Sequence, residues 1–505
     1  MDHEISMLRK LTKILFGNRS RAQDVTDQSP RLNDDPEASP RRERSRGGRA
    51  QLADLDLSDA EIVERENHCI TRRNISPNAL KVLYRLNDAG YHAFLVGGGV
   101  RDLLLGDTPK DFDIATDATP EQIKQLFRNA LIIGRRFRIV HLRFGREIIE
   151  ATTFRAHHGP TNEFQNDTSS RQIKGLDSAY ASSGLILRDN VYGDINEDAL
   201  RRDFTVNALY YTIDGFRIID FVGGLDDIER RLLRIIGDPE TRYREDPVRL
   251  LRAVRFASKL DFDIEKNTRA PMDDLAHLLE SISPARLFDE SLKLLAGGHA
   301  ERTFAMLRQF KVGEFMFRRT MACTRDPNHP WYKLVNLALR NTDARLADGR
   351  TVTPAFLYAA LLWPPLQNEL EKYGNERASL TSQQEAANRV IGNQLKTTSI
   401  PKRFSIAMRE IWELQLRLSV RSRRGAESVY AHPRFRAAYD FLLLREEAGE
   451  QTGGLGQWWT DFQTADRNQQ ERMLEELGKG TPRPRKRRRR SRKPAAGSAD
   501  MGKSA

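Results

Sequence analysis

The stretch Leu95–Thr116, LVGGGVRDLLLGDTPKDFDIAT, decides the fold of this chain. Its pattern predicts a short apolar strand, a glycine turn, a helix, a short loop and a second strand. Three consecutive glycines, Gly97–Gly99, let the backbone turn sharply and come close to a ligand. Arg101 follows in the first turn of the predicted helix, where free N–H groups and the positive end of the helix dipole favour a phosphate.

Two acidic residues, Asp111 and Asp113, lie on the second predicted strand. Side chains alternate between the faces of a strand, so both carboxylates point the same way. Adjacent carboxylates repel each other unless a cation lies between them, and Mg²⁺ is commonly held by carboxylates together with substrate phosphates. A glycine turn alone, or an Asp-x-Asp pair alone, is more often a plain turn or a solvated strand end. Together they favour chemistry on a nucleoside triphosphate.

The glycine run differs from two common phosphate-binding motifs. No Gly-Lys-Ser/Thr follows it, so it is not a P-loop. The spacing of a dinucleotide-binding turn is also missing, and no acidic residue is placed to bind a ribose.

Composition favours a polyanionic partner in a reducing compartment. The 505 residues carry a net charge of +12, and 30% of them are charged. Such a balance favours nucleic acid or an acidic membrane surface. Two cysteines, Cys69 and Cys323, make neither a disulfide framework nor a convincing metal site, so we expect a cytoplasmic protein. No run of about 20 apolar residues predicts a transmembrane helix.

Both ends of the chain are expected to be disordered. Residues 17–60 are polar and poor in aromatics, and order is expected to begin near Ile75. Leu8–Leu15 could form a short basic amphipathic helix that touches a membrane or a partner, or could simply be a frayed terminus. Nine basic residues between Arg483 and Lys493 should bind phosphates in a salt-dependent way. Without them the net charge falls to about +3 (12 − 9).

Between the ends, the pattern first predicts a mixed sheet with flanking helices. Helices should start at Ser76-Pro77 and at Thr119-Pro120, where a capping side chain precedes proline. Strands are predicted at 132–134, 139–144 and 147–154, and the last would bring Glu150 close to the two aspartates if the strands are adjacent. Glu150 is then either a third carboxylate of the site or a partly exposed strand residue. Residues 157–184 are predicted to be a mobile loop.

From Glu245 onward the pattern is almost entirely helical. Arg249, Arg252 and Arg255 recur three residues apart on one helix. Such a stripe can bind a triphosphate or an RNA backbone, and the competing interpretation is a solvated charged face. Helical periodicity then runs through 285–475, and Trp458-Trp459 is expected to pack in a late helix.

Several motifs resemble the class II nucleotidyltransferases of the polymerase β superfamily, which include bacterial poly(A) polymerases and tRNA CCA-adding enzymes. The resemblance spans roughly residues 70–475. The motifs that carry it are Gly97-Gly98 with Arg101-Asp102, the Asp111/Asp113 pair, Arg201–Ala208 (RRDFTVNA), Gly223–Asp226 (GGLD) and Glu245–Arg249 (EDPVR). Within the family, the chain is more similar to the poly(A) polymerase branch. The stretches that favour this branch are 134–138, 187–190, 401–403, 432–436 and the arginine-rich tail.

The resemblance implies a set of residue roles. Asp111, Asp113 and Asp203 would be catalytic, and the first two would hold Mg²⁺. Contacts with ATP are implied for a further set: Gly98, Arg101, Arg202, Arg252 and Arg255 at the triphosphate and ribose, and Asp246 and Arg249 at the adenine edge. The reaction expected is template-independent transfer of AMP to RNA 3′ ends with release of pyrophosphate. Proteins of RNA decay or RNA-chaperone type are conceivable partners.

The predicted fold class is α+β, with a small mixed-sheet head followed by a helical neck and body. The expected divisions are a leader (1–69), a nucleotidyltransferase head (70–225), a neck with base and RNA contacts (226–315), an RNA-binding body (316–478) and a basic tail (479–505). Three other functions compete: CCA addition to tRNA, a non-catalytic RNA-binding protein, and an antibiotic nucleotidyltransferase. Intact aspartates argue against the second, and the long helical half and basic tail against the third.

Overall fold

The computed structural model describes residues 48–134, 138–156, 178–180, 186–189, 191–376, 379–419 and 423–478. The amphipathic segment at Leu8–Leu15 and the arginine-rich tail lie outside these residues, as does most of the predicted loop at 157–184. Within that loop, strand β7 (Ser178–Tyr180) pairs with β8 (Ile186–Asp189) in antiparallel fashion. The loop prediction is therefore wrong for 178–180, where the backbone finds a partner strand.

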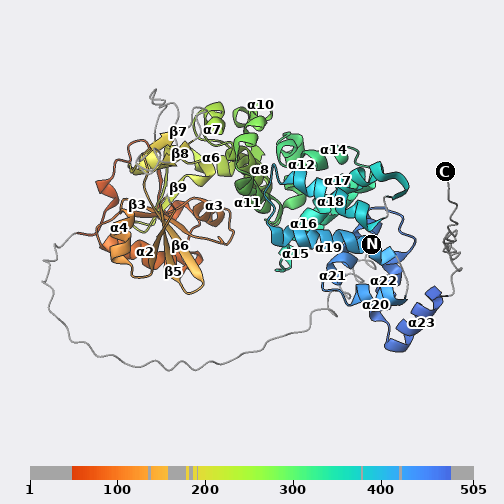
Figure 1. The fold of residues 1–505 in the computed structure, drawn as a ribbon. Coiled ribbons are helices and arrows are strands. Elements are labelled where there is room, and N and C mark those ends of the chain that lie inside the picture. The colour runs from red at the N-terminus through yellow and green to blue at the C-terminus, as the bar shows by residue number, and fades with distance from the viewer. Residues whose placement is uncertain are drawn as a thin grey trace, which may run out of the picture. The chain divides into compact units, whose positions relative to one another are not determined.

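One mixed eight-stranded sheet organises the first half of the described chain (Figure 1). Its strand order is β1-β10-β9-β2-β3-β6-β5-β4, and among these pairs only β3 with β6 is parallel. The strands are β1 (Glu61–Val63), β2 (Ala93–Val96), β3 (Asp113–Thr116), β4 (Ala130–Ile133), β5 (Ile139–Phe144), β6 (Glu147–Thr153), β9 (Leu209–Thr212) and β10 (Ile218–Asp220). The strands predicted at 132–134, 139–144 and 147–154 are confirmed, with ends shifted by one or two residues.

Alternation along the strands gives the sheet two buried faces. Leu95 and Ile114 lie in one apolar cluster, which helices cover. Phe94 and Ala115, their immediate neighbours, lie in a second cluster with Leu52. The helices of this part are α2 (Pro77–Asp88), α3 (Gly98–Leu104), α4 (Pro120–Leu126), α5 (Ile195–Leu200) and α6 (Gly224–Glu229).

The two predicted helix starts are confirmed by their caps. Ser76 accepts hydrogen bonds from the backbone N–H groups of Asn78 and Ala79, with Pro77 at the first helical position. At α4, Thr119 accepts from the N–H of Gln122, whose side chain accepts from Thr119 N in return. These reciprocal bonds satisfy N–H groups that a helix start otherwise leaves unpaired.

Order begins earlier in the chain than the sequence predicted. Strand β1 pairs with β10 at one edge of the sheet, with Ile62 opposite Ile219. Leu52 and Ile70 are buried. The expectation that order begins near Ile75 is therefore wrong for residues 48–74, because this polar stretch supplies an edge strand and a few apolar anchors to the sheet.

The second half is helical, as predicted (Figure 1). Two helices, α7 (Pro239–Glu245) and α8 (Val248–Leu260), follow the sheet, and a short parallel pair, β11 (Leu232–Leu233) and β12 (Asp263–Ile264), flanks them. The remaining helices are α9 (Lys266–Arg269), α10 (Met272–Leu275), α11 (Pro284–Leu295), α12 (Ala300–Gln309), α13 (Gly313–Met316), α14 (Arg318–Cys323), α15 (Pro330–Ala347), α16 (Pro354–Leu361), α17 (Trp363–Leu370), α18 (Leu380–Gln394), α19 (Lys402–Ser419), α20 (Arg423–Tyr430), α21 (Phe435–Glu447), α22 (Leu455–Thr464) and α23 (Arg467–Gly478).

The predicted packing role of the late tryptophans is confirmed for Trp459. Its ring is fully buried, and its Nε1 donates a hydrogen bond to the carbonyl of Leu418 at 3.1 Å. The α+β fold class is confirmed as well. Across the part of the chain that the structure describes, no helix combines the length and apolarity needed to cross a membrane.

Candidate functional site

The glycine turn lies between β2 and α3 and requires glycine at its first position. Gly97 has φ of +71°, a conformation that a side chain disfavours. A Cβ at Gly97 would lie 3.6 Å from Nη1 of Arg202, and a Cβ at Gly98 would lie 3.2 Å from Nη2 of Arg101. The turn therefore brings two arginine side chains close to its backbone.

Three carboxylates gather beside this turn. Asp113 begins β3 and lies directly opposite Glu150 of the parallel strand β6. Burial, the neighbouring Glu150 and, more weakly, Asp111 raise the pKa of Asp113 to about 6, although Arg202 acts in the opposite sense. Asp111 is exposed in the segment just before the strand. The predicted closeness of Glu150 is confirmed; its Oε1 also lies 3.0 Å from Nε2 of His141.

This crowding of negative charge fits a bound cation. A carboxylate whose pKa is raised by neighbouring negative charge, as that of Asp113 is, is stabilised in its charged form when a cation binds beside it. In the described ranges, no three His, Cys, Asp or Glu side chains are arranged to hold a metal ion by themselves. Such an incomplete set suits Mg²⁺, which usually keeps several waters and takes further oxygens from substrate phosphates.

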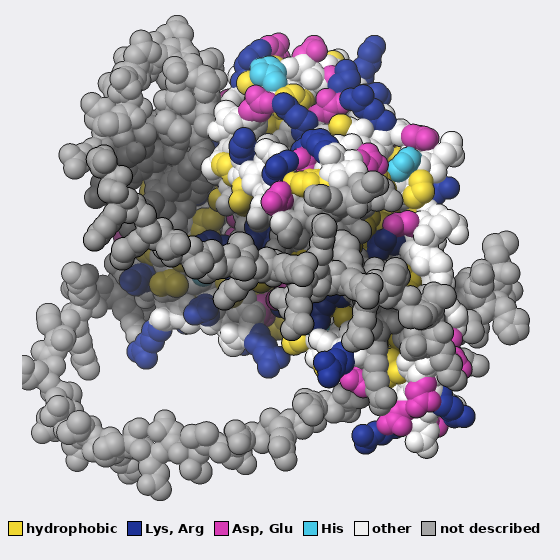
Figure 2. All heavy atoms as spheres, turned by 45° about the vertical axis from the view of Figure 1, so that its right-hand side comes forward, with side chains coloured by type: hydrophobic (Ala, Val, Ile, Leu, Met, Phe, Trp, Pro, Cys, Tyr) yellow, Lys and Arg dark blue, Asp and Glu magenta, His cyan; other side chains and the backbone are white. Residues whose placement is uncertain are grey.

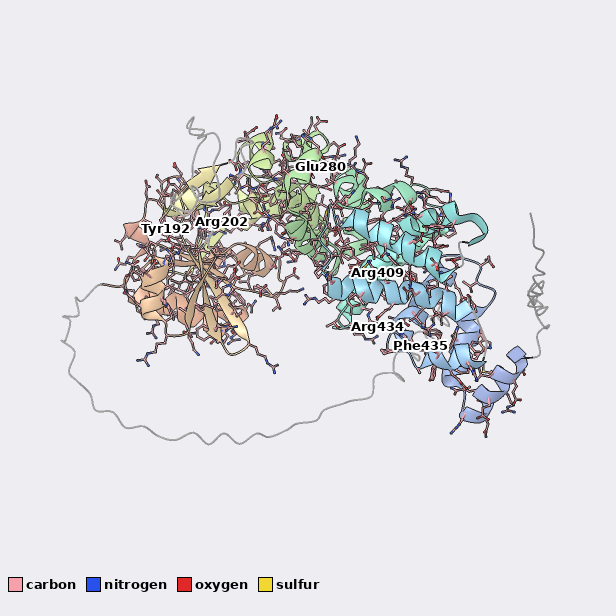
Figure 3. All side chains as sticks on the ribbon, viewed as in Figure 1. Tyr192, Arg202, Glu280, Arg409, Arg434 and Phe435 are labelled. Carbon is pink, nitrogen blue, oxygen red and sulfur yellow. The ribbon has the colours of Figure 1, made fainter. Side chains whose placement is uncertain are left out.

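Arg202 is held against this site by a buried network. Its Nη2 lies 2.9 Å from Oδ2 of Asp198, and its Nε lies 2.9 Å from the hydroxyl of Tyr210. Burial alone would raise the pKa of Asp198. The charges of Arg202 and Arg201 and the hydrogen bond from the Tyr210 hydroxyl outweigh burial and lower this pKa to about 2. Asp198 is thus a fixed anion that orients Arg202. Figure 3 shows Arg202 in the sheet-bearing part of the chain.

Arg101 points into the protein. Only 2% of it is exposed, and it donates hydrogen bonds to Asp102 and to Oδ1 of Asn207. Asp102 also accepts from Nζ of Lys259 at 3.0 Å, which ties α3 to α8. The structure therefore places Arg101 as a brace beneath the glycine turn.

Asp203 is likewise engaged by its neighbours. Its Oδ2 accepts from Arg252, and its Oδ1 accepts from Asn207 and from the N–H of Phe204. Burial alone would raise the pKa of Asp203. The charge and hydrogen bond of Arg252, together with the hydrogen bonds from Asn207 and the N–H of Phe204, outweigh burial and lower this pKa to about 2.

The stripe of arginines on α8 divides into two environments. Arg252 and Arg255 lie over the ring of Phe256, at 5.2 and 4.6 Å from its centroid, and Arg101 reaches the same ring at 5.3 Å. Burial and the charge of Arg252 lower the pKa of Arg255, and its buried Nε has no hydrogen-bond partner. Three guanidinium groups surround this ring. Arg101 and Arg252 pair with Asp102 and Asp203, whereas Arg255 has no ion pair among the described residues, so this positive locus can attract an anion.

Asp246 and Arg249 lie at the junction of α7 and α8, and each already has a protein partner. Oδ2 of Asp246 accepts from Nη2 of Arg286 at 2.8 Å, and Nη1 of Arg249 donates to Oε2 of Glu245 at 2.7 Å. Asp246 keeps 22% of its side chain exposed, whereas Arg249 is buried. These pairs fix the two side chains in place.

Several residues of these networks were not singled out from the sequence. Asp198 lies four residues before Arg202 on one helical turn, a spacing that could have indicated the ion pair. Arg286 and Arg242, which connect separate elements, gave no local signal because their partners lie about 40 residues away.

Comparisons with known proteins identify the family. Three family models match: "Poly A polymerase head domain" over residues 93–234, "Probable RNA and SrmB- binding site of polymerase A" over 261–323, and "Polymerase A arginine-rich C-terminus" over 375–493. Poly(A) polymerase I of Salmonella typhimurium is 48% identical over 421 residues, which cover 82% of this chain and 88% of that protein. The Escherichia coli protein of the same name is 48% identical over 440 residues, covering 86% and 92%.

CCA-adding enzymes match less of the chain. The enzyme of Lactobacillus helveticus is 36% identical over 236 residues, which cover 47% of this chain and 54% of that protein. A solved structure of a tRNA-processing enzyme in an apo form shares the fold, with a TM-score of 0.52 at 20% identity over 81% of this chain and 98% of that one. The chain belongs to the poly(A) polymerase I family of nucleotidyltransferases.

Proposed function

We propose that this protein is a template-independent polynucleotide adenylyltransferase, which transfers AMP from ATP to RNA 3′ ends and releases pyrophosphate. One observation carries the proposal: the similarity to poly(A) polymerase I extends over at least 82% of the chain in the Salmonella and Escherichia proteins, helical half included. The carboxylates at β3 and the positive locus at α8 give such a reaction a place for metal and triphosphate.

Asp111 and Asp113 would hold Mg²⁺, with Glu150 as the neighbouring third carboxylate. Bound there, Mg²⁺ would supply charge stabilisation to the oxygens of the reacting phosphate. Arg202, fixed by Asp198 and Tyr210, would contact the ribose or phosphates beside the aspartates.

The triphosphate would meet the positive locus on α8. We assign its outer phosphates to Arg252 and Arg255, because the three neighbouring guanidinium groups repel one another and an incoming anion relieves this repulsion. Asp203 contributes by holding Arg252, through contacts of 2.5 and 2.7 Å. Gly98 would let the phosphates approach the backbone closely, and Arg101 would brace that turn from below.

The adenine edge would be recognised at the start of α8. Asp246 offers carboxylate oxygens that can accept from the exocyclic amine, and Arg249 offers N–H groups to ring nitrogens. Both side chains are held by ion pairs, with Arg286 and Glu245 respectively. A preorganised pair of this kind selects one base without a nucleic-acid template.

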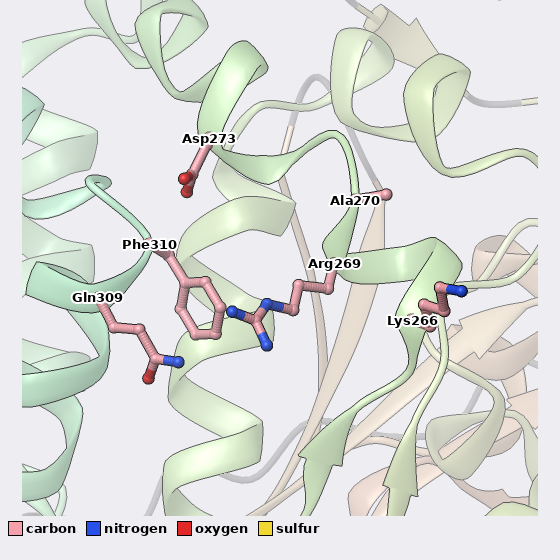
Figure 4. Close-up of a pocket in the computed structure, with 6 residues that line it drawn as sticks. All are labelled: Lys266, Arg269, Ala270, Asp273, Gln309 and Phe310. Atoms are coloured by element: carbon pink, nitrogen blue, oxygen red, sulfur yellow. The ribbon is translucent and has the colours of Figure 1, made fainter.

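RNA would bind along the helical half, mainly through phosphates. The visible face in Figure 2 carries many Lys and Arg side chains interspersed with acidic ones. A cavity of about 340 Å³ lies in the range that matches the RNA-binding family model, and it is lined by Lys266, Arg269, Ala270, Asp273, Gln309 and Phe310 (Figure 4).

This cavity, which we call the neck pocket, suits a nucleotide of the bound RNA. The guanidinium of Arg269 lies over the Phe310 ring, 5.2 Å from its centroid. The side-chain amide of Gln309 points toward this guanidinium (Figure 4). Lys266 and Arg269 are exposed, and neither has an ion-pair partner among the described residues. Exposed cations beside a stacked guanidinium plane are features that bind single-stranded RNA.

The arginine-rich tail would add phosphate contacts. The reaction consumes ATP and acts on RNA, so we place it in the cytoplasm; proteins of RNA decay or RNA-chaperone type are the protein partners we propose.

One experiment tests the function. The protein is incubated with Mg²⁺ and each nucleotide separately, on an unstructured RNA oligonucleotide and on a tRNA that lacks its 3′ end. A long ladder with ATP alone on the oligonucleotide is expected. Addition of two residues from CTP, confined to the tRNA and with no ladder from ATP, would favour CCA addition, the alternative that the partial match to CCA-adding enzymes keeps open. No product in any lane would indicate a non-catalytic RNA-binding protein.

A further inference from the structure

Arg242 is a buried arginine that links two separate parts of the proposed nucleotide site. It lies on α7, which Asp238 caps by accepting from the N–H of Thr241. Only 5% of Arg242 is exposed. No role in catalysis was expected for it from the sequence, and its guanidinium contacts no acidic residue of the metal site.

The first set of contacts reaches back 40 residues along the chain. Nη2 of Arg242 lies 2.6 Å from the carbonyl oxygen of Arg201 and 2.5 Å from that of Arg202. Both carbonyls belong to residues 201–204, which we call the phosphate-side loop because it carries Arg202 and Asp203. One terminal nitrogen therefore clamps two consecutive peptide groups of this loop.

The second set of contacts reaches forward to the adenine edge. Nη1 of Arg242 donates to Oε2 of Glu245 at 2.8 Å. The same oxygen accepts from Nη1 of Arg249 at 2.7 Å, and Nη1 of Arg249 also donates to the backbone carbonyl of Arg242 at 2.8 Å. Arg242, Glu245 and Arg249 thus form a closed unit around one carboxylate oxygen.

The other end of the phosphate-side loop is fastened independently. The N–H of Ile236 donates to the carbonyl of Asp203 at 3.1 Å, and the N–H of Thr205 donates to the carbonyl of Arg234 at 3.0 Å. These backbone bonds hold the loop after Asp203. Arg242 supplies contacts on the side of Arg201 and Arg202, so the loop is anchored on both sides of its functional residues.

We propose that Arg242 is a positioning residue that sets the phosphate-side loop relative to the adenine-reading pair Asp246 and Arg249, and so couples nucleotide choice to catalysis. This inference rests on the proposed function. The proposal concerns positions. The phosphate-side loop determines where Arg202 contacts the nucleotide, and the contacts around Glu245 determine where Arg249 contacts the base. The guanidinium of Arg242 thus holds the base-binding residues and the phosphate-binding residues at a fixed distance from each other.

The contacts require a guanidinium and not merely a positive charge. Arginine presents two terminal nitrogens in a planar fork, which here point to carbonyls on one side and to a carboxylate on the other. Lysine has a single ammonium and cannot reach both sides at once. Burial, and the nearby guanidinium of Arg249, lower the pKa of Arg242 to about 10, yet it stays charged at neutral pH.

The test compares Arg242→Lys with Arg244→Lys. Arg244 lies two residues later on the same helix and is about half exposed. Within the described residues it pairs with Glu240 alone, so it is a matched control for a lost guanidinium. For each variant and the wild type, kcat and KM are measured for ATP and for CTP on one RNA oligonucleotide. Thermal unfolding is followed by circular dichroism so that rates refer to folded protein.

Arg242→Lys is expected to lower kcat/KM for ATP by roughly tenfold to a hundredfold, the loss that a small misplacement of reacting groups produces. The ratio of kcat/KM for ATP to that for CTP is expected to fall as well, while Arg244→Lys keeps both values. A purely structural role would reduce folded protein but leave this ratio unchanged, and that result would overturn the inference. If the wild type itself adds no AMP, the proposed function is wrong. If the wild type adds AMP and Arg242→Lys has the same kcat/KM for ATP and for CTP, only the proposed role of Arg242 is wrong.

Discussion

Arg252 and Asp203 lie 49 residues apart in the sequence and form one ion pair, with Nη2 and Nε of Arg252 at 2.5 and 2.7 Å from Oδ2 of Asp203. The pair joins helix α8 to the loop that follows α5. Because Asp203 also accepts from Asn207 and from the N–H of Phe204, it is the anchor of a wider network. We propose that an aspartate so engaged acts on the nucleotide through Arg252.

Asp203→Asn is expected to destabilise the fold and to impair AMP addition. The substitution leaves Arg252, whose side chain is 32% exposed, without its anion, which should cost about 2 kcal/mol. The free energy of unfolding is measured in urea. Asp226→Asn is the control, because Asp226 pairs with Arg230 at 3.5 Å and both side chains are about two-thirds exposed. Equal losses for the two variants would contradict a structural role for the Asp203 pair.

Asp111→Ala should abolish AMP incorporation without unfolding the protein. Asp111 is exposed and has no hydrogen-bond partner to lose in the described structure, so its removal affects the cation and not the core. The measurements are primer extension with ATP and Mg²⁺, together with the thermal unfolding curve. Asp107→Ala, an exposed aspartate in the preceding loop, should keep activity. Incorporation that survives Asp111→Ala would refute the assignment.

Acid should destabilise the protein partly through Asp198. Its pKa is lowered to about 2 from the ordinary 3.8, mainly by the guanidinium groups of Arg202 and Arg201 acting against burial. The unfolded chain therefore binds a proton that the folded protein rejects, and stability is lost as the pH falls from about 5 to about 2. The effect amounts to about 2–3 kcal/mol.

The measurement is the free energy of unfolding in urea at several pH values. Asp198→Asn should be less stable than the wild type at pH 7, and its stability should fall less steeply between pH 5 and pH 2. Parallel curves for the two proteins over that range would show that Asp198 is not ionised against the arginines as the structure indicates.

The neck pocket should contribute to RNA affinity but not to ATP binding. Replacing Lys266 and Arg269 together by alanine removes two exposed cations, worth about 0.5–1 kcal/mol each, so affinity for a long RNA should fall roughly 5- to 30-fold. Fluorescence anisotropy without ATP measures this across oligonucleotides of increasing length. The paired, exposed arginines Arg230 and Arg244 supply the control double variant. If the double variant binds RNA as tightly as the wild type, the neck pocket does not contribute to RNA binding. The KM for ATP is expected to stay the same in this variant.

Deleting residues 479–505 should flatten the salt dependence of RNA binding. The deletion removes the nine basic residues between Arg483 and Lys493. If each releases a counterion on binding, the slope of log K against log salt falls by up to about six. Nucleotide binding should be spared, and an unchanged slope would count against a phosphate-binding tail.

Much of the sheet and its carboxylates could be predicted because the signals are local. Ser76 and Thr119 precede prolines at helix starts, and alternation predicted strands close to those observed. The opposition of Asp113 and Glu150 required only adjacency of two strands. The edge strand at Glu61–Val63 could not be predicted in the same way, because a polar stretch becomes a strand only when β10 offers it a partner.

The contacts of the buried arginines could not be predicted from the sequence. Arg101 is near the start of a helix, which favours a phosphate contact, yet its side chain turns inward to Asn207, 106 residues later. Arg242 has no motif, since its function depends on carbonyls of a distant loop. Spacing along one helix predicts which residues share a face, but not which of them the tertiary fold will bury.

We propose that the protein selects ATP without a template and continues to add AMP to the RNA. The most direct measurement supplies all four nucleotides together with Mg²⁺ to an unstructured RNA oligonucleotide and sequences the extended 3′ ends. Long tails made almost entirely of adenosine are expected. Extension that stops after the sequence CCA, or tails of mixed composition, would contradict it.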